Sequence, residues 1–384
     1  MNFSSRRDIN ITIRRHFTLG VPILLAMGLT GFGCGGDDPV TPPVPVNRTW
    51  RTTPDGVGAD CPTPQDCLDQ AASGDTLEFG AGTFDAVADT LVDDGMGGQV
   101  TALLVARRST VLRAADGADV RINGQWEPGR IGLAIPAGND TIEVTGLRFD
   151  NCDAGIRVTN ATLRVEDCVF VSGQHGLVAD GAALDIRDSD FSEFAAEAAL
   201  MRACRGTMSG CTFLGNNYGL FVANPNNLRI ENSLVSVCCL TGIRIEEGGM
   251  VTLAGLTVTR VGMVPDDSTG IVVAGGAHAL VERCVIADNR GFGIDCRAGG
   301  TVTVTCSDIV NHSSGNYHGC ADATGTSGNL SVNPGFCAPD DLNFHLAADS
   351  PARLAACGPM GAFPEVSCAA ISLSAATAAR RGRD

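Results

Sequence analysis

The chain has 384 residues, a formal net charge of −16 and 48 glycines, with 5% aromatic and 18% charged residues. All 27 basic residues are arginine, which excludes a mechanism that needs a lysine base or a lysine Schiff base. The acidic balance argues against nucleic acid as the main partner. It is compatible with bound calcium, although the sequence has no EF-hand-like spacing of ligands.

The first 33 residues have the pattern of an export signal. Four arginines precede an apolar run from Phe17 to Phe32, which is too short and too interrupted by Gly and Pro for a membrane span. The stretch Gly31-Phe32-Gly33-Cys34 resembles a bacterial lipobox, although Gly31 stands where that motif prefers leucine. The resemblance implies cleavage before Cys34 and a lipid on its sulfur. We therefore expect a membrane-anchored lipoprotein of the bacterial cell envelope, at the outer membrane or cell surface, or a secreted protein if lipidation fails.

Residues 34–47 are predicted to be a tether in front of a domain that spans 48–368. The sequence GGDDPVTPPVPV cannot build a core and is semi-rigid where proline is dense. A short helix is predicted at 64–72, where it would cover the open end of the domain and prevent strand edges from pairing with another chain. At the other end, residues 369–384 are Ala-rich and are predicted to be disordered.

Between Gly132 and Val310 the sequence repeats every 20 to 28 residues in one register. Each copy opens with Gly and a short apolar alternation, and two further alternations of period two follow. The openings read GIRV, GLVA, GLFV, GIRI, GIVV and GIDC, starting at residues 155, 176, 219, 242, 270 and 293. The copy between the second and third of these is aligned at ALMR from residue 199 and has no opening glycine. Three short strands per copy indicate a solenoid whose units bury their apolar faces against their neighbours.

One inward position of the repeat supports this arrangement. It is occupied by Phe149, Phe170, Phe191 and Phe213 in four successive copies and by Val or Ile in later ones. Equivalent residues of neighbouring coils would lie about 4.8 Å apart and stack as ladders. On these repeats the chain resembles the pectate-lyase-like, right-handed parallel β-helix families. The resemblance implies an all-β, single-stranded, three-sheet solenoid of about ten or eleven coils with a short capping helix, and it leaves the activity open.

The sixteen cysteines do not all have the same expected role. Cys168, Cys211 and Cys284 share an inward column and are predicted to be buried, inert thiols. Cysteines near the ends of the domain are expected to form disulfides that staple loops and caps, as in other exported proteins. The expected pairs are Cys61 with Cys67, Cys306 with Cys320, and Cys357 with Cys368. Because no Cys-x-x-Cys pair occurs and the six histidines are scattered, we predict no metal site of the zinc type.

Fragments of a polygalacturonase-type site occur but do not form a complete set. Asn151-Cys-Asp153, Gln174-His175-Gly176 and Arg244-Ile-Glu246 match its motifs in part, whereas the paired aspartates are missing and Glu246 stands where a lysine belongs. A lyase would need an arginine base and calcium-binding carboxylates over one groove. Since the outward acids are dispersed over the copies, we expect no catalytic site in the repeat array.

The outward positions of the first alternation form a largely apolar column with an arginine toward each end. Two explanations stay open: a turn loop or the tail covers the column, or the column binds a glycan or a surface protein. The residues predicted for such a binding strip are Arg157, Met201, Phe221, Arg244 and Asp295. The enlarged loop from Thr259 to Thr269, which contains Asp266 and Asp267, is the other place where a ligand would be expected.

Three functions follow from these observations. A tethered, non-enzymatic β-helix that binds a glycan or protein partner is the leading hypothesis. A polysaccharide lyase or glycoside hydrolase is the second, and a disulfide-stapled rod that self-associates through an end is the third. Carboxylates clustered in one groove would favour the enzyme, an uncovered apolar strip the binder, and an uncapped end the rod.

Overall fold

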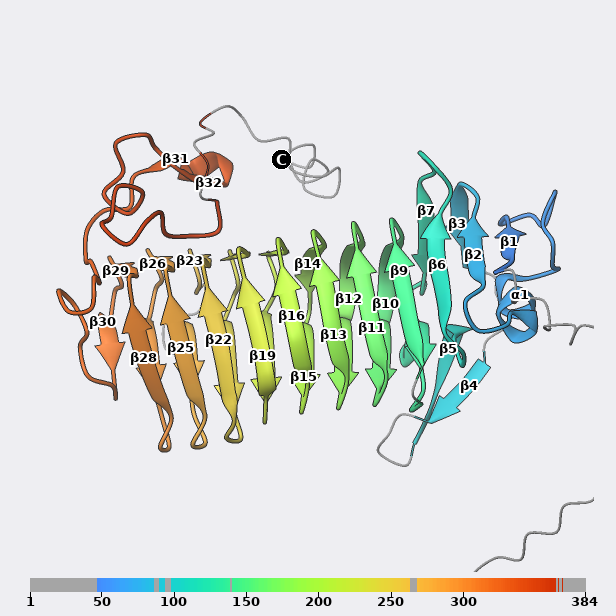
Figure 1. Cartoon of the computed structure of the whole chain (residues 1–384), viewed down its shortest axis with the longest axis horizontal. Helices are drawn as coiled ribbons and strands as arrows, with labels where there is room; N and C mark the ends of the chain where they lie inside the picture. The colour runs from blue at the N-terminus through green and yellow to red at the C-terminus, as the bar shows by residue number, and fades with distance from the viewer. Residues whose placement is uncertain are drawn as a thin grey trace, which may run out of the picture. The chain divides into compact units, whose positions relative to one another are not determined.

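The computed structural model describes residues 47–85, 90–93, 98–138, 140–262, 268–363, 365 and 368. The export signal, Cys34, the tether, the acids of the enlarged loop (Asp266 and Asp267) and the predicted tail lie outside the described residues. In the described part, short parallel strands wind into a β-helix with three sheets (Figure 1). No helix of that part is long and apolar enough to cross a membrane.

Sheet 1 has one strand from each of eleven coils, which agrees with the expected number of ten or eleven. Its strands correspond to the second alternation of the repeat and pair in parallel in chain order. They are β1 (Thr49–Thr52), β2 (Thr76–Phe79), β6 (Thr110–Ala114), β9 (Thr141–Thr145), β11 (Thr162–Glu166), β13 (Ala183–Arg187), β16 (Arg205–Ser209), β19 (Asn226–Glu231), β22 (Met250–Ala254), β25 (His278–Glu282) and β28 (Thr301–Thr305).

Sheets 2 and 3 share the long strands β10 (Arg148–Thr159) and β12 (Val169–Asp180), whose first parts belong to sheet 2 and last parts to sheet 3. The other strands of sheet 2 are β3 (Gly82–Phe84), β7 (Val120–Asn123), β14 (Asp190–Phe194), β17 (Thr212–Leu214), β20 (Leu234–Ser236), β23 (Thr257–Thr259), β26 (Val285–Ala287) and β29 (Asp308–Val310). Those of sheet 3 are β5 (Gln99–Val105), β8 (Arg130–Ile135), β15 (Glu197–Arg202), β18 (Tyr218–Ala223), β21 (Thr241–Glu246), β24 (Thr269–Val273), β27 (Phe292–Cys296) and β30 (Gly315–His318). β4 (Thr90–Asp93) pairs antiparallel with β5.

The corner between sheets 2 and 3 is made by one left-handed residue in most coils. Asn151, Ser172 and Glu193 have φ of 55°, 60° and 65° at this corner. The glycine that opens each repeat follows a few residues later, and a close approach explains it. A Cβ on Gly155 would lie 2.7 Å from the carbonyl oxygen of Gly176 in the next coil and 2.7 Å from the Phe170 ring. At Gly155 a side chain would therefore collide with the next coil, whereas the coil of Ala198 accommodates an alanine at this position.

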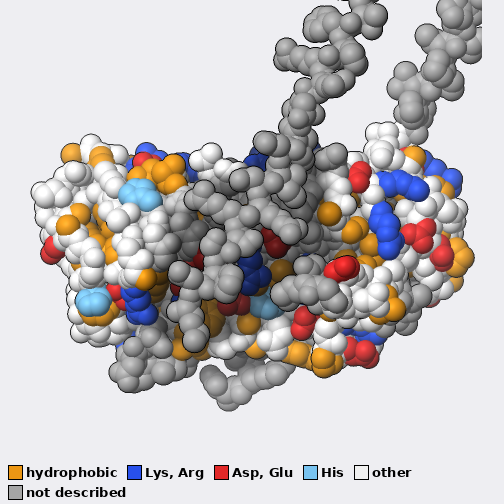
Figure 2. Space-filling model, turned by 90° about the horizontal axis from the view of Figure 1, so that it is seen from below, with side chains coloured by type: hydrophobic (Ala, Val, Ile, Leu, Met, Phe, Trp, Pro, Cys, Tyr) orange, Lys and Arg blue, Asp and Glu red, His pale blue; other side chains and the backbone are white. Residues whose placement is uncertain are grey.

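The core is a set of inward ladders, as predicted. Phe149, Phe170, Phe191 and Phe213 are each at most 1% exposed, and their rings stack in order with centroids 5.1, 4.5 and 5.0 Å apart. Outward positions are mixed in character. On the face shown in Figure 2, acidic, basic and apolar side chains are interspersed rather than gathered by type.

Two segments cap or cover the β-helix. The predicted helix is present as α1 (Pro64–Gln70), with Thr63 and Asp66 forming a capping box, and it contacts β1, β2 and β5 at the N-terminal end. The C-terminal segment contains β31 (Phe336–Ala338), the 3₁₀ helix η1 (Pro339–Asp341) and β32 (Asn343–Leu346). This segment folds back on the outer side of sheet 2, where Leu346 and Met360 pack against outward residues of β26 and β29 (Figure 1).

Four disulfides link the described cysteines near the two ends: Cys61–Cys67, Cys296–Cys320, Cys306–Cys357 and Cys337–Cys368. The expected pair Cys61–Cys67 is confirmed. The expected pairs Cys306–Cys320 and Cys357–Cys368 are wrong, although all four cysteines are in disulfides. Cys320 follows β30, which lies beside β27 and therefore beside Cys296. Cys357 reaches Cys306 because the C-terminal segment folds back over the β-helix.

The inward thiols are buried as predicted. Cys168, Cys211 and Cys284 are at most 1% exposed, and burial raises the pKa of each thiol to about 12. A thiol with so high a pKa forms almost no thiolate near neutral pH, so these cysteines fill core space.

Candidate functional site

The outer side of sheet 3 holds most of the predicted binding residues, and we call it the sheet-3 face. Parallel pairing aligns one outward residue from each coil, in what we call the Phe221 row. The row runs through Arg157, Val178, Leu200, Phe221, Arg244, Val272, Asp295 and His318. Neighbours in the row are about 4.8 Å apart, so the row follows the axis of the β-helix.

Four of the five predicted residues lie in this row, and Met201 does not. Met201 pairs with Ala179 and Val222, points into the core and is 0% exposed. Its neighbour Leu200 takes the outward place. The error is a shift of one residue in the copy without a glycine, and such a shift moves every side chain to the opposite face of a strand.

The N-terminal end of the Phe221 row is covered. Outward residues of β5, β8 and β10 form a small cluster of their own, and Val92 of β4 packs on it together with Val100 and Val178. The first explanation, that a loop covers the column, therefore holds for this end. Further along the row Leu200, Phe221 and Arg244 are half-buried and in contact with solvent.

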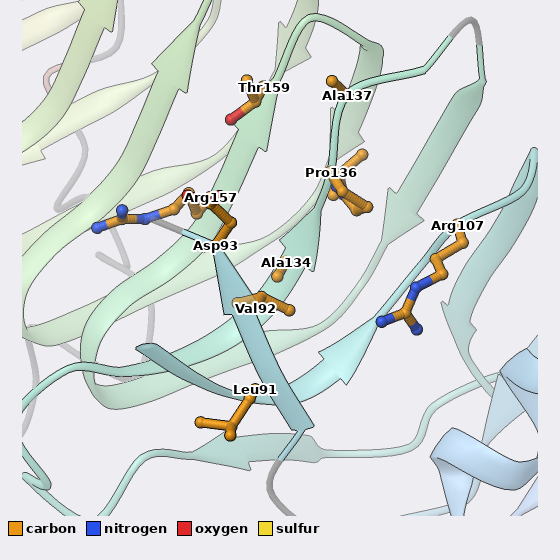
Figure 3. Close-up of a pocket in the computed structure, with 10 residues that line it drawn as sticks. Leu91, Val92, Asp93, Arg107, Ala134, Pro136, Ala137, Arg157 and Thr159 are labelled. Carbon is orange, nitrogen blue, oxygen red and sulfur yellow. The ribbon is translucent and has the colours of Figure 1, made fainter. Parts of the chain in front are cut away.

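A cavity of about 450 Å³ lies where β4 crosses the strand ends of sheet 3 (Figure 3). Its walls include the apolar side chains of Leu91, Ala134 and Pro136. Arg107 points into it and Arg157 borders it, as Figure 3 shows. This volume is in the range of small-ligand sites. Arg107 would favour a group with negative charge, whereas the lining also includes the carboxylate of Asp93, and the Arg157 guanidinium points away from the cavity in Figure 3.

A second row of outward residues runs beside the first, near the corner with sheet 2, and we call it the Tyr218 row. It contains His175, Glu197, Tyr218, Thr241, Thr269 and Phe292, in the order of the coils. His175 Nδ1 and Glu197 Oε2 are 3.3 Å apart, and their side chains are 21% and 20% exposed. The contact with His175 holds the pKa of Glu197 below its ordinary value, so this carboxyl is ionised at neutral pH.

The charged residues of the Phe221 row have partners on the same sheet. Arg244 Nε donates a hydrogen bond of 2.7 Å to Glu246, and its Cζ lies 6.0 Å from the centroid of the Phe221 ring. At the far end Asp295 is only 1% exposed. Its carboxylate contacts Arg297 at 2.5 Å and His318 at 2.8 Å. The carboxylates of Glu246 and Asp295 are thus held in ion pairs.

Glu246 and Asp295 lie farther apart than the paired carboxyl groups of a glycoside hydrolase. Glu246 and Asp295 lie two coils and two strand positions apart, which we estimate as about 12 Å between backbones. Glycoside hydrolases hold their carboxyl groups about 5 to 10 Å apart. Among the described residues no group of three His, Cys, Asp or Glu side chains could hold a metal ion.

The repeat pattern of the sequence did not predict the Tyr218 row. His175, Tyr218 and Phe292 each directly precede the glycine that opens a copy. The recurring motif begins at that glycine, and the residue before it varies too much in type to mark the repeat. In the structure this position faces outward at the start of the sheet-3 strand. An alignment extended by one residue would have shown two aromatic residues and a histidine in one column.

Residues 133–264 match the family model described as "Right handed beta helix region". The chain has a pectate-lyase-like, right-handed parallel β-helix fold. It is similar to the crystal structure of pectate lyase Pel9A, with a TM-score of 0.53 and 13% identity over 84% of this chain and 98% of that one.

Two further solved structures resemble this β-helix less closely. An alginate lyase from Paenibacillus sp. str. FPU-7 has a TM-score of 0.46 and 13% identity, covering 71% of this chain and 97% of that chain. The periplasmic alginate epimerase AlgG has a TM-score of 0.44 and 10% identity, covering 64% of this chain and 69% of that chain. No curated protein sequence matches the chain. At these identities the comparisons establish the fold and not the activity.

Proposed function

We propose that this β-helix binds a glycan chain along the sheet-3 face and does not cleave it. The observation that carries the proposal is the cluster of Tyr218, Phe221 and Arg244 on adjacent strands β18 and β21. Tyr218 and Phe221 are half-buried, so each ring is held by its neighbours while part of it meets solvent. Aromatic rings give contact area at low entropic cost, and an arginine adds directed hydrogen bonds.

The direction of the rows supports an elongated ligand. Both rows follow the axis of the β-helix, and their half-buried side chains lie on successive coils about 4.8 Å apart: His175, Glu197, Leu200, Tyr218, Phe221 and Arg244. Farther along, Thr269, Val272 and Asp295 are at most 2% exposed. β4 closes the N-terminal end of the Phe221 row, and the Arg107 and Arg157 side chains stand beside it. A chain that carries acidic groups would find these arginines at one end and Arg244 in the middle.

The test is a glycan array probed with the purified domain, followed by affinity measurements on the oligosaccharides that bind. We expect the double variant Tyr218→Ala/Phe221→Ala to lose at least tenfold in affinity, which corresponds to about 1.4 kcal/mol. Arg164→Ala is the matched control, because Arg164 pairs with Glu143 on sheet 1. The proposal fails if no glycan binds, or if the double variant binds as well as the control.

A second candidate is a polysaccharide lyase, and the His175–Glu197 pair favours it. A carboxylate beside Nδ1 orients an imidazole, and an oriented imidazole suits a general base. Tyr218, on the strand after Glu197, could supply a proton to a leaving group. To decide between binding and cleavage, the protein is incubated with pectate and with alginate, and the formation of new reducing ends is measured. If wild type forms product and His175→Ala does not, the protein is a lyase and the proposal of binding without cleavage is wrong.

Export and anchoring remain proposals as well. We propose that the β-helix is held at a membrane of the bacterial envelope by a lipid on Cys34, or is secreted if no lipid is added. The support is the basic segment, the apolar run and the lipobox-like stretch in the sequence. A surface position would give a glycan-binding face access to polymers outside the cell.

A further inference from the structure

One exposed tryptophan has an unusual backbone conformation. Trp126 is 62% exposed and has φ of 62°, and Gln125 before it has φ of 57°. Left-handed conformations are disfavoured for large side chains, and an exposed tryptophan leaves apolar surface in water. Left-handed residues make this corner in most coils, so the backbone conformation is part of the fold, whereas the exposed indole has no role in packing and indicates a functional reason.

The turn that carries Trp126 is held firmly by its neighbours. Arg130 is 7% exposed, and its guanidinium lies 3.4 Å from Gln125 Oε1 and 3.5 Å from Glu127. The Trp126 amide donates a hydrogen bond of 3.0 Å to the carbonyl of Asn151 in the next coil. The indole is therefore displayed from a fixed turn.

This turn occupies the same corner of the β-helix as the start of the Tyr218 row. Trp126 bonds to Asn151, and the neighbouring Cys152 is in register with Gly173. Gly173 accepts a hydrogen bond from the amide of Ala195, and the amide of Asn217 bonds to Phe194. Trp126 and Asn217, which precedes Tyr218, are therefore four coils apart. At about 4.8 Å per coil, Trp126 and Tyr218 are about 19 Å apart along the axis.

The other end of the Tyr218 row also has an aromatic residue. Phe292 lies three coils beyond Tyr218, about 14 Å away along the axis. Its ring is half-buried and stacks on the imidazole of His318 with centroids 4.5 Å apart. Between Trp126 and Tyr218 the row contributes Ala154, which is buried in the cluster beside β4, and then the polar side chains of His175 and Glu197. Between Tyr218 and Phe292 it contributes Thr241 and Thr269, which are 4% and 2% exposed.

We propose that Trp126 and Phe292 are the outer aromatic subsites of one extended glycan path of about 33 Å, with Tyr218 at its centre. This inference rests on the proposed glycan binding and adds its extent and its outermost contacts. A sugar ring stacks on each aromatic side chain, and a short oligosaccharide held at Tyr218 does not reach Trp126. The contribution of Trp126 therefore appears only with chains long enough to span about 19 Å.

The experiment measures affinity against chain length. The probes are size-fractionated oligogalacturonates and, in parallel, neutral cello-oligosaccharides, each from the dimer upward. For Trp126→Ala we expect about tenfold weaker binding of long chains, the factor that corresponds to about 1.4 kcal/mol, and unchanged binding of short ones. Tyr218→Ala should weaken short and long chains alike. Trp126→Phe should restore most of the affinity for long chains.

A second variant separates binding from folding. Trp126→Gly relieves the left-handed strain, so its melting temperature should equal or exceed that of the wild type while the affinity for long chains falls. A clear drop in melting temperature would mean that Trp126 is structural and would overturn the inference. Equal losses for short and long chains would do the same and leave glycan binding intact. If no member of either series binds the wild type, the inference and the proposed function both fail.

Discussion

Replacing Phe170 by alanine tests the central ladder of the β-helix. Its ring is 1% exposed and is sandwiched between Phe149 and Phe191, with centroids 5.1 and 4.5 Å away and planes within 6° and 4° of parallel. The substitution removes both stacks and leaves a cavity between coils that contact only their neighbours. Large-to-small changes at aromatic core positions cost about 3 to 5 kcal/mol.

The expected shift can be read as a melting temperature. For about 320 residues that unfold together, an unfolding entropy of about 2.1 cal/mol/K per residue gives about 1.5 °C per kcal/mol, hence a drop of about 4 to 7 °C. Phe221→Ala is the matched control, because this phenylalanine lies on the outer side of β18 and is only half-buried. It should cost about 1 kcal/mol. If thermal unfolding followed by circular dichroism gave equal shifts for the two variants, the assignment of inward and outward columns would be refuted.

Three further predictions concern other parts of the chain. Met201→Asp should cost more than about 3 kcal/mol and Leu200→Asp less than about 1, since only the first buries a carboxylate, and similar melting temperatures would contradict the register. Burial raises the pKa of Asp308 from 3.8 to about 6. The stability from its protonated form is complete below about pH 4 and lost as the pH rises through 6. Asp308→Asn should therefore raise the melting temperature relative to wild type at pH 8 but not at pH 4, and a difference that is constant with pH would disprove this. Mass spectrometry of the membrane fraction should find a lipid on Cys34, and an unmodified mature N-terminus would exclude the anchor.

Much of the fold could be predicted because every coil of a solenoid repeats the same pattern of inward and outward positions in the sequence. Phe149, Phe170, Phe191 and Phe213 recur at one position because they touch the same position of the next coil. The predicted register is wrong in the copy that lacks the opening glycine, which is the copy around Ala198. There the prediction places Met201 on the outward face, whereas its side chain points into the core.

The candidate site was harder to predict, because coverage depends on segments outside the repeat. Nothing in the local sequence of β4 shows that Val92 packs over the outward residues of β5, β8 and β10. The disulfide pairing failed for a related reason. Cys357 contacts Cys306 because the C-terminal segment folds back over the β-helix, and the distance between the two cysteines along the sequence does not predict this contact. Periodic positions were predictable, whereas contacts made by insertions and termini were not.

The most direct test of the central claim is a crystal structure of the β-helix with a bound oligosaccharide from the glycan array. We predict an uncleaved chain that runs parallel to the axis of the β-helix over sheet 3. Its sugar rings should contact Tyr218 and Phe221, and a polar group should be within hydrogen-bond distance of Arg244. A chain bound on sheet 1 or sheet 2, or a cleaved product beside His175 and Glu197, would contradict the account.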